Sequence, residues 1–287
     1  MTIRMAIPNK GRLNERAVEL LTKSGIDLGE DWGRKLYVKA KDQDVEVLFV
    51  RAQDIPAFID TGVIDIGITG EDMVAESGYT LTNLFNLGFG ICRLSICVPE
   101  SSNISSFEDM PAGMRIATSF PYVTKKFFDA GKKEVTVIEV TGAAEIMPYL
   151  GISDMISDLV ATGSTLKTNR LKEICTILDS QAAVFSSDKI LSSKRKEIVD
   201  VVDSIRSVMD AENRKYLMAD VPVKMVKDVE KILPGIGGPT ILNIAGNNDM
   251  VAVHAVVRSE DVYKVVNDLK RLGAKGILTL SIDRLVE

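Results

Sequence analysis

One stretch constrains the fold of this chain more than any other. A short apolar run from 156 to 160 passes directly into five small residues and then into a polar segment. The apolar run predicts a buried strand, and the small residues predict a tight turn that opens a helix. Strands that lead through turns into helices build α/β folds. The same alternation recurs at 3–20, 45–60 and 65–72, so the sequence predicts an α/β protein with parallel strands.

The turn has the composition of a phosphate site. Backbone N–H groups at the start of a helix have no partner within the helix and carry partial positive charge, so they bind anions. Thr162, Ser164 and Thr165 add hydroxyl donors, and a hydrogen bond to a charged group contributes roughly 1.5 to 3 kcal/mol. Gly163 lacks a Cβ, which allows close approach. The same residues also cap helices that bind no ligand, so both interpretations stay open for the turn alone.

An acid precedes the turn at a useful distance. Asp158 stands four to seven residues before the three hydroxyls, on the exit side of the predicted strand. Its carboxylate can accept hydrogen bonds from a sugar diol while the turn holds a phosphate. A phosphate and a diol at that separation describe ribose 5-phosphate.

Cations mark a second candidate anion site. Lys10 and Arg12 flank Gly11 between a predicted strand at 3–7 and a predicted helix from 13, and Arg51 directly follows the strand at 45–50. Open α/β sheets bind ligands at the carboxyl ends of their strands. These positions suit nucleotide phosphates or pyrophosphate. The alternative is that Lys10 and Arg12 are solvated surface charges.

Ten positions in the central stretch together match a known signature. They are Glu145, Gly151, Ser153, Ile156, Asp158, Leu159, Thr162, Gly163, Thr165 and Leu166. Three further stretches agree, at 8–13, at Arg51 with 54–56, and at 65–70. On these residues the chain resembles the ATP phosphoribosyltransferases, the enzymes that open histidine biosynthesis, and its C-terminal extension resembles that of the long form of the family.

The resemblance implies an activity and a set of site residues. ATP and phosphoribosyl pyrophosphate would be joined with Mg2+ as cofactor, in dimers that assemble into hexamers, and histidine would inhibit between subunits. Asp158 and Glu145 would be catalytic. The phosphoribosyl pyrophosphate site would comprise Asp158, Ala161, Thr162, Gly163, Ser164 and Thr165. ATP or pyrophosphate would contact Lys10, Gly11, Arg12, Arg51 and Asp72. Histidine would contact Asp220, Gly238, Thr240 and Gly276.

Domain organisation follows from the order of predicted elements. The family's fold resembles two-lobed periplasmic binding proteins, which implies one lobe from 1–92 with 180–212 and a second lobe from 93–179. From 213 to 287 the predicted order is βαββαβ, which is the ferredoxin-like plan of a separate domain. Glu145 lies in a predicted helix at 143–150, and Pro148 inside it predicts that the helix is short or bent.

Composition limits the remaining possibilities. A net charge of -5 with interspersed signs indicates neither nucleic acid nor an anionic membrane as partner. His254 is the only histidine and there are three cysteines, which disfavours a transition-metal site or a disulfide framework. No apolar run suggests a signal peptide or a membrane span. A cytoplasmic enzyme is the expectation.

Two other functions remain as alternatives. A two-lobed protein could bind a phosphorylated metabolite without catalysis, or the C-terminal domain could sense an amino acid while the lobes are relics. The complete phosphoribosyl-binding stretch argues against the first, and the motifs in both lobes argue against the second.

Overall fold

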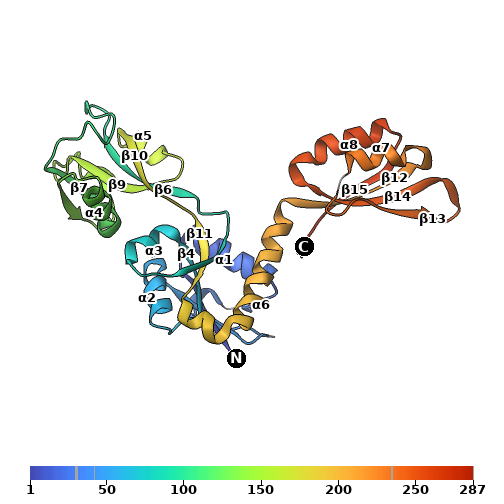
Figure 1. The fold of residues 1–287 in the computed structure, drawn as a ribbon, viewed down its shortest axis with the longest axis horizontal. Coiled ribbons are helices and arrows are strands. Elements are labelled where there is room, and N and C mark those ends of the chain that lie inside the picture. The colour runs from blue at the N-terminus through green and yellow to red at the C-terminus, as the bar shows by residue number, and fades with distance from the viewer. Residues whose placement is uncertain (30–31, 42, 234, 287) are drawn as a thin grey trace. The chain divides into compact units, whose positions relative to one another are not determined.

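The computed structural model describes residues 1–29, 32–41, 43–233 and 235–286. The strands lie in three sheets of six, five and four strands. The chain divides into two compact units, of which the first comprises Met1–Thr22 with Ile26–Val202 and the second comprises Lys23–Gly25 with Asp203–Glu287. The first unit contains the two larger sheets and the second unit contains the smallest one (Figure 1).

The six-stranded sheet is built around a parallel centre. Its order is β2 (Tyr37–Lys39), β3 (Val45–Val50), β1 (Ile3–Pro8), β4 (Ile66–Gly70), β11 (Ala182–Ser186) and β5 (Thr82–Asn86). The strand β1 runs parallel to β3 and β4, while β2 and β11 pair antiparallel. Its helices are α1 (Gly11–Lys23), α2 (Ile55–Asp60), α3 (Glu71–Ser77) and the 3-10 turns η1 (Trp32–Arg34) and η2 (Ala52–Asp54). The parallel pairing sets the ends of β1 and β3 side by side, because Pro8 is opposite Val50.

The five-stranded sheet carries the predicted strand and turn. Its order is β10 (Leu171–Ser180), β6 (Cys92–Pro99), β9 (Met155–Val160), β7 (Met114–Thr118) and β8 (Val135–Glu139). It is associated with α4 (Pro121–Ala130), η3 (Ala144–Ile146) and α5 (Ser164–Thr168). Separate apolar clusters cover its two faces, one containing Ile156 and Leu166 and the other containing Met155 and Phe128. Burial on both faces explains why apolar residues follow one another in β6 and at the start of β9.

Two local expectations differ from the structure. The polar run after Leu166 forms a helix of only five residues, and the ten residues of β10 follow as an unpredicted strand. Arg170 has a left-handed backbone with φ 51°, which ends the helix. The strand β5 was also not expected. The prediction for 143–150 is confirmed, because the helix is reduced to the single turn η3 and Pro148 follows it.

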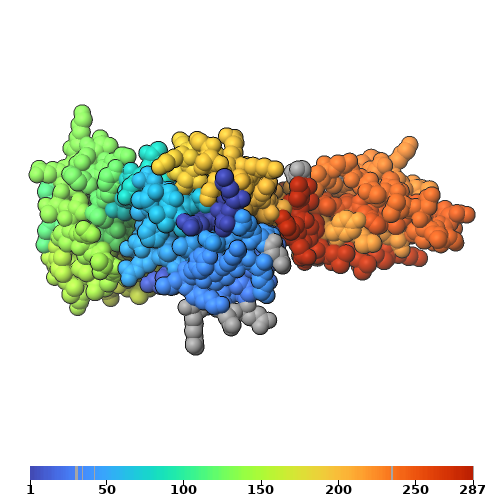
Figure 2. Space-filling model, turned by 90° about the horizontal axis from the view of Figure 1, so that it is seen from below, coloured from blue at the N-terminus to red at the C-terminus, as the bar shows by residue number. Residues whose placement is uncertain are grey.

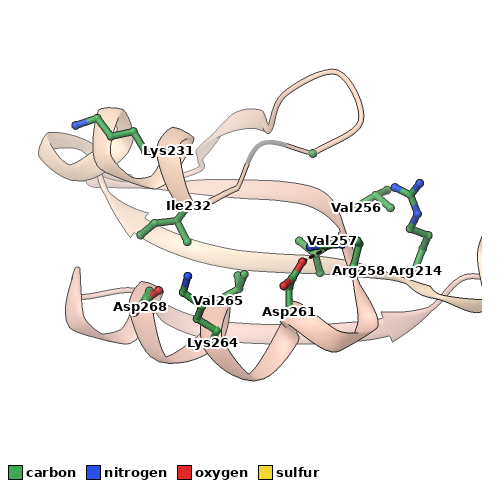
Figure 3. A pocket seen from close by; sticks show the side chains of 11 residues that line it. Arg214, Lys231, Ile232, Val256, Val257, Arg258, Asp261, Lys264, Val265 and Asp268 are labelled. Atoms are coloured by element: carbon green, nitrogen blue, oxygen red, sulfur yellow. Dashed lines mark hydrogen bonds and ion pairs between the residues drawn. The ribbon is translucent and has the colours of Figure 1, made fainter.

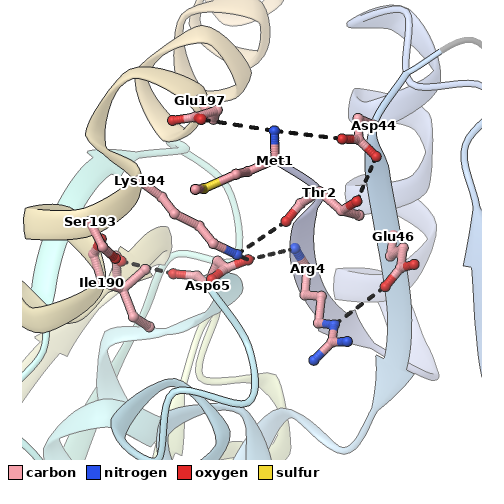
Figure 4. A network of polar contacts seen from close by, with 11 residues as sticks. Met1, Thr2, Arg4, Asp44, Glu46, Asp65, Ile190, Ser193, Lys194 and Glu197 are labelled. Carbon is pink, nitrogen blue, oxygen red and sulfur yellow. Dashed lines mark hydrogen bonds and ion pairs between the residues drawn. The ribbon is translucent and has the colours of Figure 1, made fainter.

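The long helix α6 (Asp188–Glu212) is kinked at Lys194, where φ is -128°. The Lys194 ammonium reaches down to the first sheet, where it donates to the Asp65 carboxylate at 2.9 Å and to the Thr2 carbonyl at 3.1 Å (Figure 4). The same Asp65 oxygen accepts the Arg4 backbone N–H. The N-terminal residues, dark blue in Figure 2, therefore lie at the surface beside the yellow residues of α6.

The second unit has the expected βαββαβ order. Its strands are β12 (Arg214–Pro222), β13 (Thr240–Ile244), β14 (Asn247–Arg258) and β15 (Lys275–Ser281), in the spatial order β13-β14-β12-β15. The helices α7 (Val226–Ile232) and α8 (Val262–Arg271), preceded by η4 (Val223–Met225) and η5 (Ser259–Asp261), cover one face (Figure 1). Leu217, Ala219 and Val221 are buried under them, so Met218 and Asp220 belong to the opposite, uncovered face.

Candidate active site

The predicted turn opens into a cavity of about 370 Å3, which we call the turn cavity. It lies at the end of β9 and the start of α5. Its volume is within the usual range for small-molecule sites. The residues that line it are Arg12, Glu145, Asp158, Leu159, Val160, Ala161, Thr162, Gly163, Ser164, Thr165 and Leu166. Both predicted acids therefore lie in one cavity with every residue of the turn.

Packing beneath the turn directs its polar groups outward. Leu166 is 8% exposed and packs with Ile156 and Val160. The side chains of Thr162, Ser164 and Thr165 are exposed, and the Thr162 and Ser164 hydroxyls lie 3.0 Å apart. Because α5 has only five residues, its dipole is short, and individual N–H groups and hydroxyls must provide most of any anion binding.

Gly163 is required for a different reason from the expected one. It caps α5 with φ 76° and ψ 4°, which is the left-handed region. A Cβ built on it would meet no atom within 4 Å. Backbone conformation, rather than crowding by protein atoms, therefore favours glycine at this position.

The surroundings of Asp158 in the turn cavity disfavour its charge. Asp158 is half-buried, and its carboxylate accepts the Leu159 backbone N–H at 2.8 Å. Burial, followed by repulsion from Glu145, raises the pKa of Asp158, and the Leu159 hydrogen bond only partly opposes this. A carboxylate with a raised pKa in a cavity is a functional candidate, because its ionised form gains from a cationic or hydrogen-bonding ligand.

The three predicted cations are divided between two cavities. Lys10 and Arg51 line a second cavity of about 700 Å3, which we call the cleft cavity, whereas Arg12 lines the turn cavity. Gly11 separates Lys10 from Arg12 with φ 78°. Within the described residues, the side chains of Lys10, Arg12 and Arg51 make no hydrogen bond or ion pair. All three positive charges are thus open to a ligand.

The cleft cavity joins strand ends from both larger sheets. The six-stranded sheet contributes the residues after β1 and β3, which lie together because the Asn9 N–H donates to the Val50 carbonyl at 2.8 Å. The five-stranded sheet contributes Glu139 from the end of β8 and Ser119 after β7. Sequence reasoning missed Glu139, although its position at the end of a parallel strand was a usable signal. It also missed Glu76, for which the sequence carried no signal.

Asp72 lies outside the two cavities described above. Its side chain is 5% exposed and lines neither cavity. The Ser180 hydroxyl donates to it at 2.6 Å, and the Asp72 N–H donates to the same hydroxyl at 3.0 Å. This buried pair joins the start of α3 to the end of β10. The expected contact of Asp72 with ATP or pyrophosphate stays a prediction, and the structure shows a pairing with Ser180 at this position.

The four residues expected to bind histidine form two separate groups in the C-terminal sheet. Asp220 and Gly276 are neighbours, since a Cβ on Gly276 would lie 3.2 Å from the Asp220 carboxylate. Thr240 pairs with His254 on β14, so β14 separates it, and the nearby Gly238, from Asp220 on β12. The His254 ring and the Tyr216 hydroxyl are hydrogen bonded at 2.8 Å on the uncovered face.

A cavity of about 460 Å3 lies between α7 and α8 in the second unit (Figure 3). It contains none of the expected site residues. Its charges are largely neutralised within the protein, because Arg258 pairs with Glu260 and Asp261, and Asp268 pairs with Arg271. We assign no ligand to it.

Comparison with known proteins identifies the family. The family model for ATP phosphoribosyltransferase matches residues 51–207, and the model for the HisG C-terminal domain matches residues 211–284. Curated ATP phosphoribosyltransferases from Methanocaldococcus jannaschii and Gemmatimonas aurantiaca are 41% and 42% identical, over 99% of this chain and 100% and 99% of theirs. The chain belongs to the ATP phosphoribosyltransferase family.

Members of this family are pentosyl-transferring enzymes, so the chain is an enzyme rather than a binding protein alone. A chain of the ATP phosphoribosyl transferase (HisG:HisZ) complex from Thermotoga maritima has a similar fold, with a TM-score of 0.65 and 29% identity over 73% of this chain and 99% of that one. The α/β class, with two larger sheets in the first unit and a four-stranded C-terminal domain, is confirmed for this chain. In the described part of the chain, no helix has the length and apolarity to cross a membrane.

Proposed function

We propose that this protein joins N1 of the adenine of ATP to C1 of the ribose of phosphoribosyl pyrophosphate and releases pyrophosphate, which is the first step of histidine biosynthesis. The turn cavity is the observation that carries this proposal. Its exposed hydroxyls and N–H groups suit a 5-phosphate, and its two acids suit the hydroxyls of the ribose. Arg12 adds a positive charge for the phosphate.

Asp158 has the central role in the proposed mechanism. As pyrophosphate leaves, C1 of the sugar gains positive charge and becomes oxocarbenium-like. A half-buried carboxylate stabilises such a charge better than a solvated one, because less water screens it. Glu145 would hold a ribose hydroxyl in the same cavity. Neutral N1 of adenine already has a lone pair, so the reaction needs neither a covalent nucleophile nor a strong general base, and positioning supplies much of the acceleration.

The cleft cavity would hold the nucleotide triphosphate or the departing pyrophosphate. Lys10 and Arg51 are the cations available there. Within the described residues, no cluster of three or more acidic, cysteine or histidine side chains could hold a metal ion. This suits Mg2+, which usually binds phosphate oxygens and waters with one or two carboxylates, and Glu139 is the carboxylate we assign to it. When bound, Mg2+ would neutralise charge on the pyrophosphate.

The direct test is to mix the purified protein with ATP, phosphoribosyl pyrophosphate and Mg2+, with an inorganic pyrophosphatase to remove product. We expect an ultraviolet change as adenine becomes substituted at N1, and the release of two phosphates for each adenine substituted. Omission of either substrate is the control. Binding of phosphoribosyl pyrophosphate without any product would contradict the proposed reaction and favour the two-lobed binding protein.

We also propose that histidine inhibits the enzyme through the C-terminal sheet. Asp220 offers a carboxylate for the α-amino group, and glycine at 276 keeps that carboxylate uncrowded, because a Cβ there would lie 3.2 Å from it. Thr240 and Gly238, on the other side of β14, would contact a histidine bound between two subunits.

Asp220→Asn should raise the histidine concentration needed for half-inhibition by at least about 10-fold, because it removes the charged partner of the amino group. The uninhibited rate should stay unchanged, since Asp220 is outside both catalytic cavities. Inhibition curves for the variant, the parent and an Asp268→Asn control would measure the effect. An unchanged curve for Asp220→Asn would remove this acid from the histidine site.

Assembly into homodimers and homohexamers is part of the same proposal. The uncovered face of the C-terminal sheet supports it, because Leu242, Leu278 and Leu280 are 50%, 56% and 51% exposed on it. Large apolar side chains exposed on one face of a sheet are typical of protein interfaces. The cytoplasmic location expected from the sequence stays a prediction.

A further inference from the structure

An acid from one lobe caps a helix of the other. Glu76, on α3, accepts the Tyr122 N–H at 2.9 Å with one carboxylate oxygen and the Val123 N–H at 3.0 Å with the other. These are N–H groups of the first turn of α4, which have no acceptor within the helix. The residue that precedes α4 is Phe120, whose side chain makes no capping bond. The cap of α4 therefore comes from 46 residues earlier in the chain.

A second contact follows directly on the first. Gly78 ends α3 with φ 70°, and a Cβ on it would lie 3.2 Å from the Tyr122 ring. The end of α3 thus packs closely against the first turn of α4. This pair of contacts fixes the spacing between a helix of the six-stranded sheet and a helix of the five-stranded sheet.

The cap lies at the cleft cavity. Glu76 lines it with Lys10 and Arg51 from one sheet and with Phe120 and Pro121 from the other. Burial, followed by repulsion from Glu139, raises the pKa of Glu76. The protein thus keeps this carboxylate at a position that disfavours its charge, which a simple surface cap would not require.

We propose that Glu76 is a positioning residue that holds the lobe bearing Lys10 and Arg51 in register with the lobe bearing Asp158. The inference rests on the proposed function, because it assumes that groups on both lobes act on one pair of substrates. Glu76 acts through α4 and not on a substrate. Catalysis across two lobes depends on their spacing, and a displacement of about 1 Å can lower the rate by about 100-fold.

The test compares Glu76→Ala and Glu76→Gln with the parent in the full chain. Asp129→Asn is the matched control, because it removes a carboxylate from the exposed far end of the same helix. We expect Glu76→Ala to lower kcat by about 10- to 100-fold, while its affinity for ribose 5-phosphate, measured by calorimetry, changes less than about 3-fold. The turn cavity takes all of its lining residues except Arg12 from the second lobe, so its affinity should survive. Glu76→Gln, which keeps one carbonyl acceptor, should be intermediate.

Amide hydrogen exchange provides a readout that does not depend on turnover. In Glu76→Ala, the Tyr122 and Val123 amides should exchange at least about 10-fold faster, with the centre of α4 unchanged. Faster exchange together with an unchanged kcat would mean that Glu76 only caps α4, and this would overturn the proposal. Unchanged exchange, or a loss of ribose 5-phosphate affinity equal to the loss of kcat, would also overturn it. A parent protein without activity would instead contradict the proposed function, while the exchange result would still test the cap.

Discussion

Asp158→Asn should lower kcat by roughly 100- to 1000-fold while the fold is retained, a loss comparable to the removal of one preorganised group that stabilises transition-state charge. The amide keeps the size of the side chain but carries no negative charge for the developing cation. Initial rates with both substrates saturating would measure the effect. Asp129→Asn, on an exposed site of α4, is the control for a lost carboxylate.

The same variant should lose activity but should not lose thermal stability. The pKa of Asp158 is raised mainly by burial, so the folded state binds its proton more tightly than the unfolded state does. The ionised form therefore weakens folding above the folded pKa, and this cost disappears as the pH falls through that value. At pH 8, Asp158→Asn should have a Tm equal to or above that of the parent. A lower Tm together with lower activity would indicate a structural role and contradict the assignment.

The dependence of kcat on pH, on the acidic side, is a third test of the role of Asp158. Activity needs ionised Asp158, so the rate should fall as the pH drops through a pKa above the ordinary aspartate value. Glu145→Gln removes the repulsion from the neighbouring acid. The acid limb should then shift to lower pH, and an unshifted limb would place the titrating group elsewhere.

Arg12→Gln and Arg51→Gln should each weaken the binding of a different substrate. Arg12 lines the turn cavity, so its loss should raise KM for phosphoribosyl pyrophosphate by roughly 10- to 150-fold, the range expected for one charge-assisted hydrogen bond. Arg51 lines the cleft cavity, so its loss should raise KM for ATP and weaken inhibition by pyrophosphate. The other substrate's KM should change less than about 3-fold in each variant.

The two arginine variants control for each other, because each removes one exposed positive charge. Equal effects of both on both substrates would mean that the two cavities do not hold separate groups of the reactants. Effects in the reverse order would exchange the proposed contents of the cavities. Neither result would bear on the role of Asp158, which the Asp158→Asn variant tests.

The sequence alone indicated the local elements of the catalytic site. The strand at 156–160 and the hydroxyl turn after it were predictable because an apolar run and a capping sequence are encoded by neighbouring residues. The C-terminal βαββαβ order was predictable for the same reason. The strand β10 was missed because its residues do not alternate cleanly, and two register shifts interrupt its pairing with β6.

Only the tertiary structure decided which of these residues meet. It placed Arg12 in the same cavity as Asp158, placed Lys10 in a different cavity from Arg12, buried Asp72 against Ser180 and set Glu76 against the first turn of α4. The pairs that meet, Glu76 with Tyr122, Asp72 with Ser180, and Arg12 with Asp158 in one cavity, are between 46 and 146 positions apart (158 minus 12 for the longest). The spacing of apolar residues and the residue types of turns depend only on residues that are close together in the sequence. The meeting of distant side chains depends instead on strand order and on how one sheet packs beside another, and no local pattern encodes that.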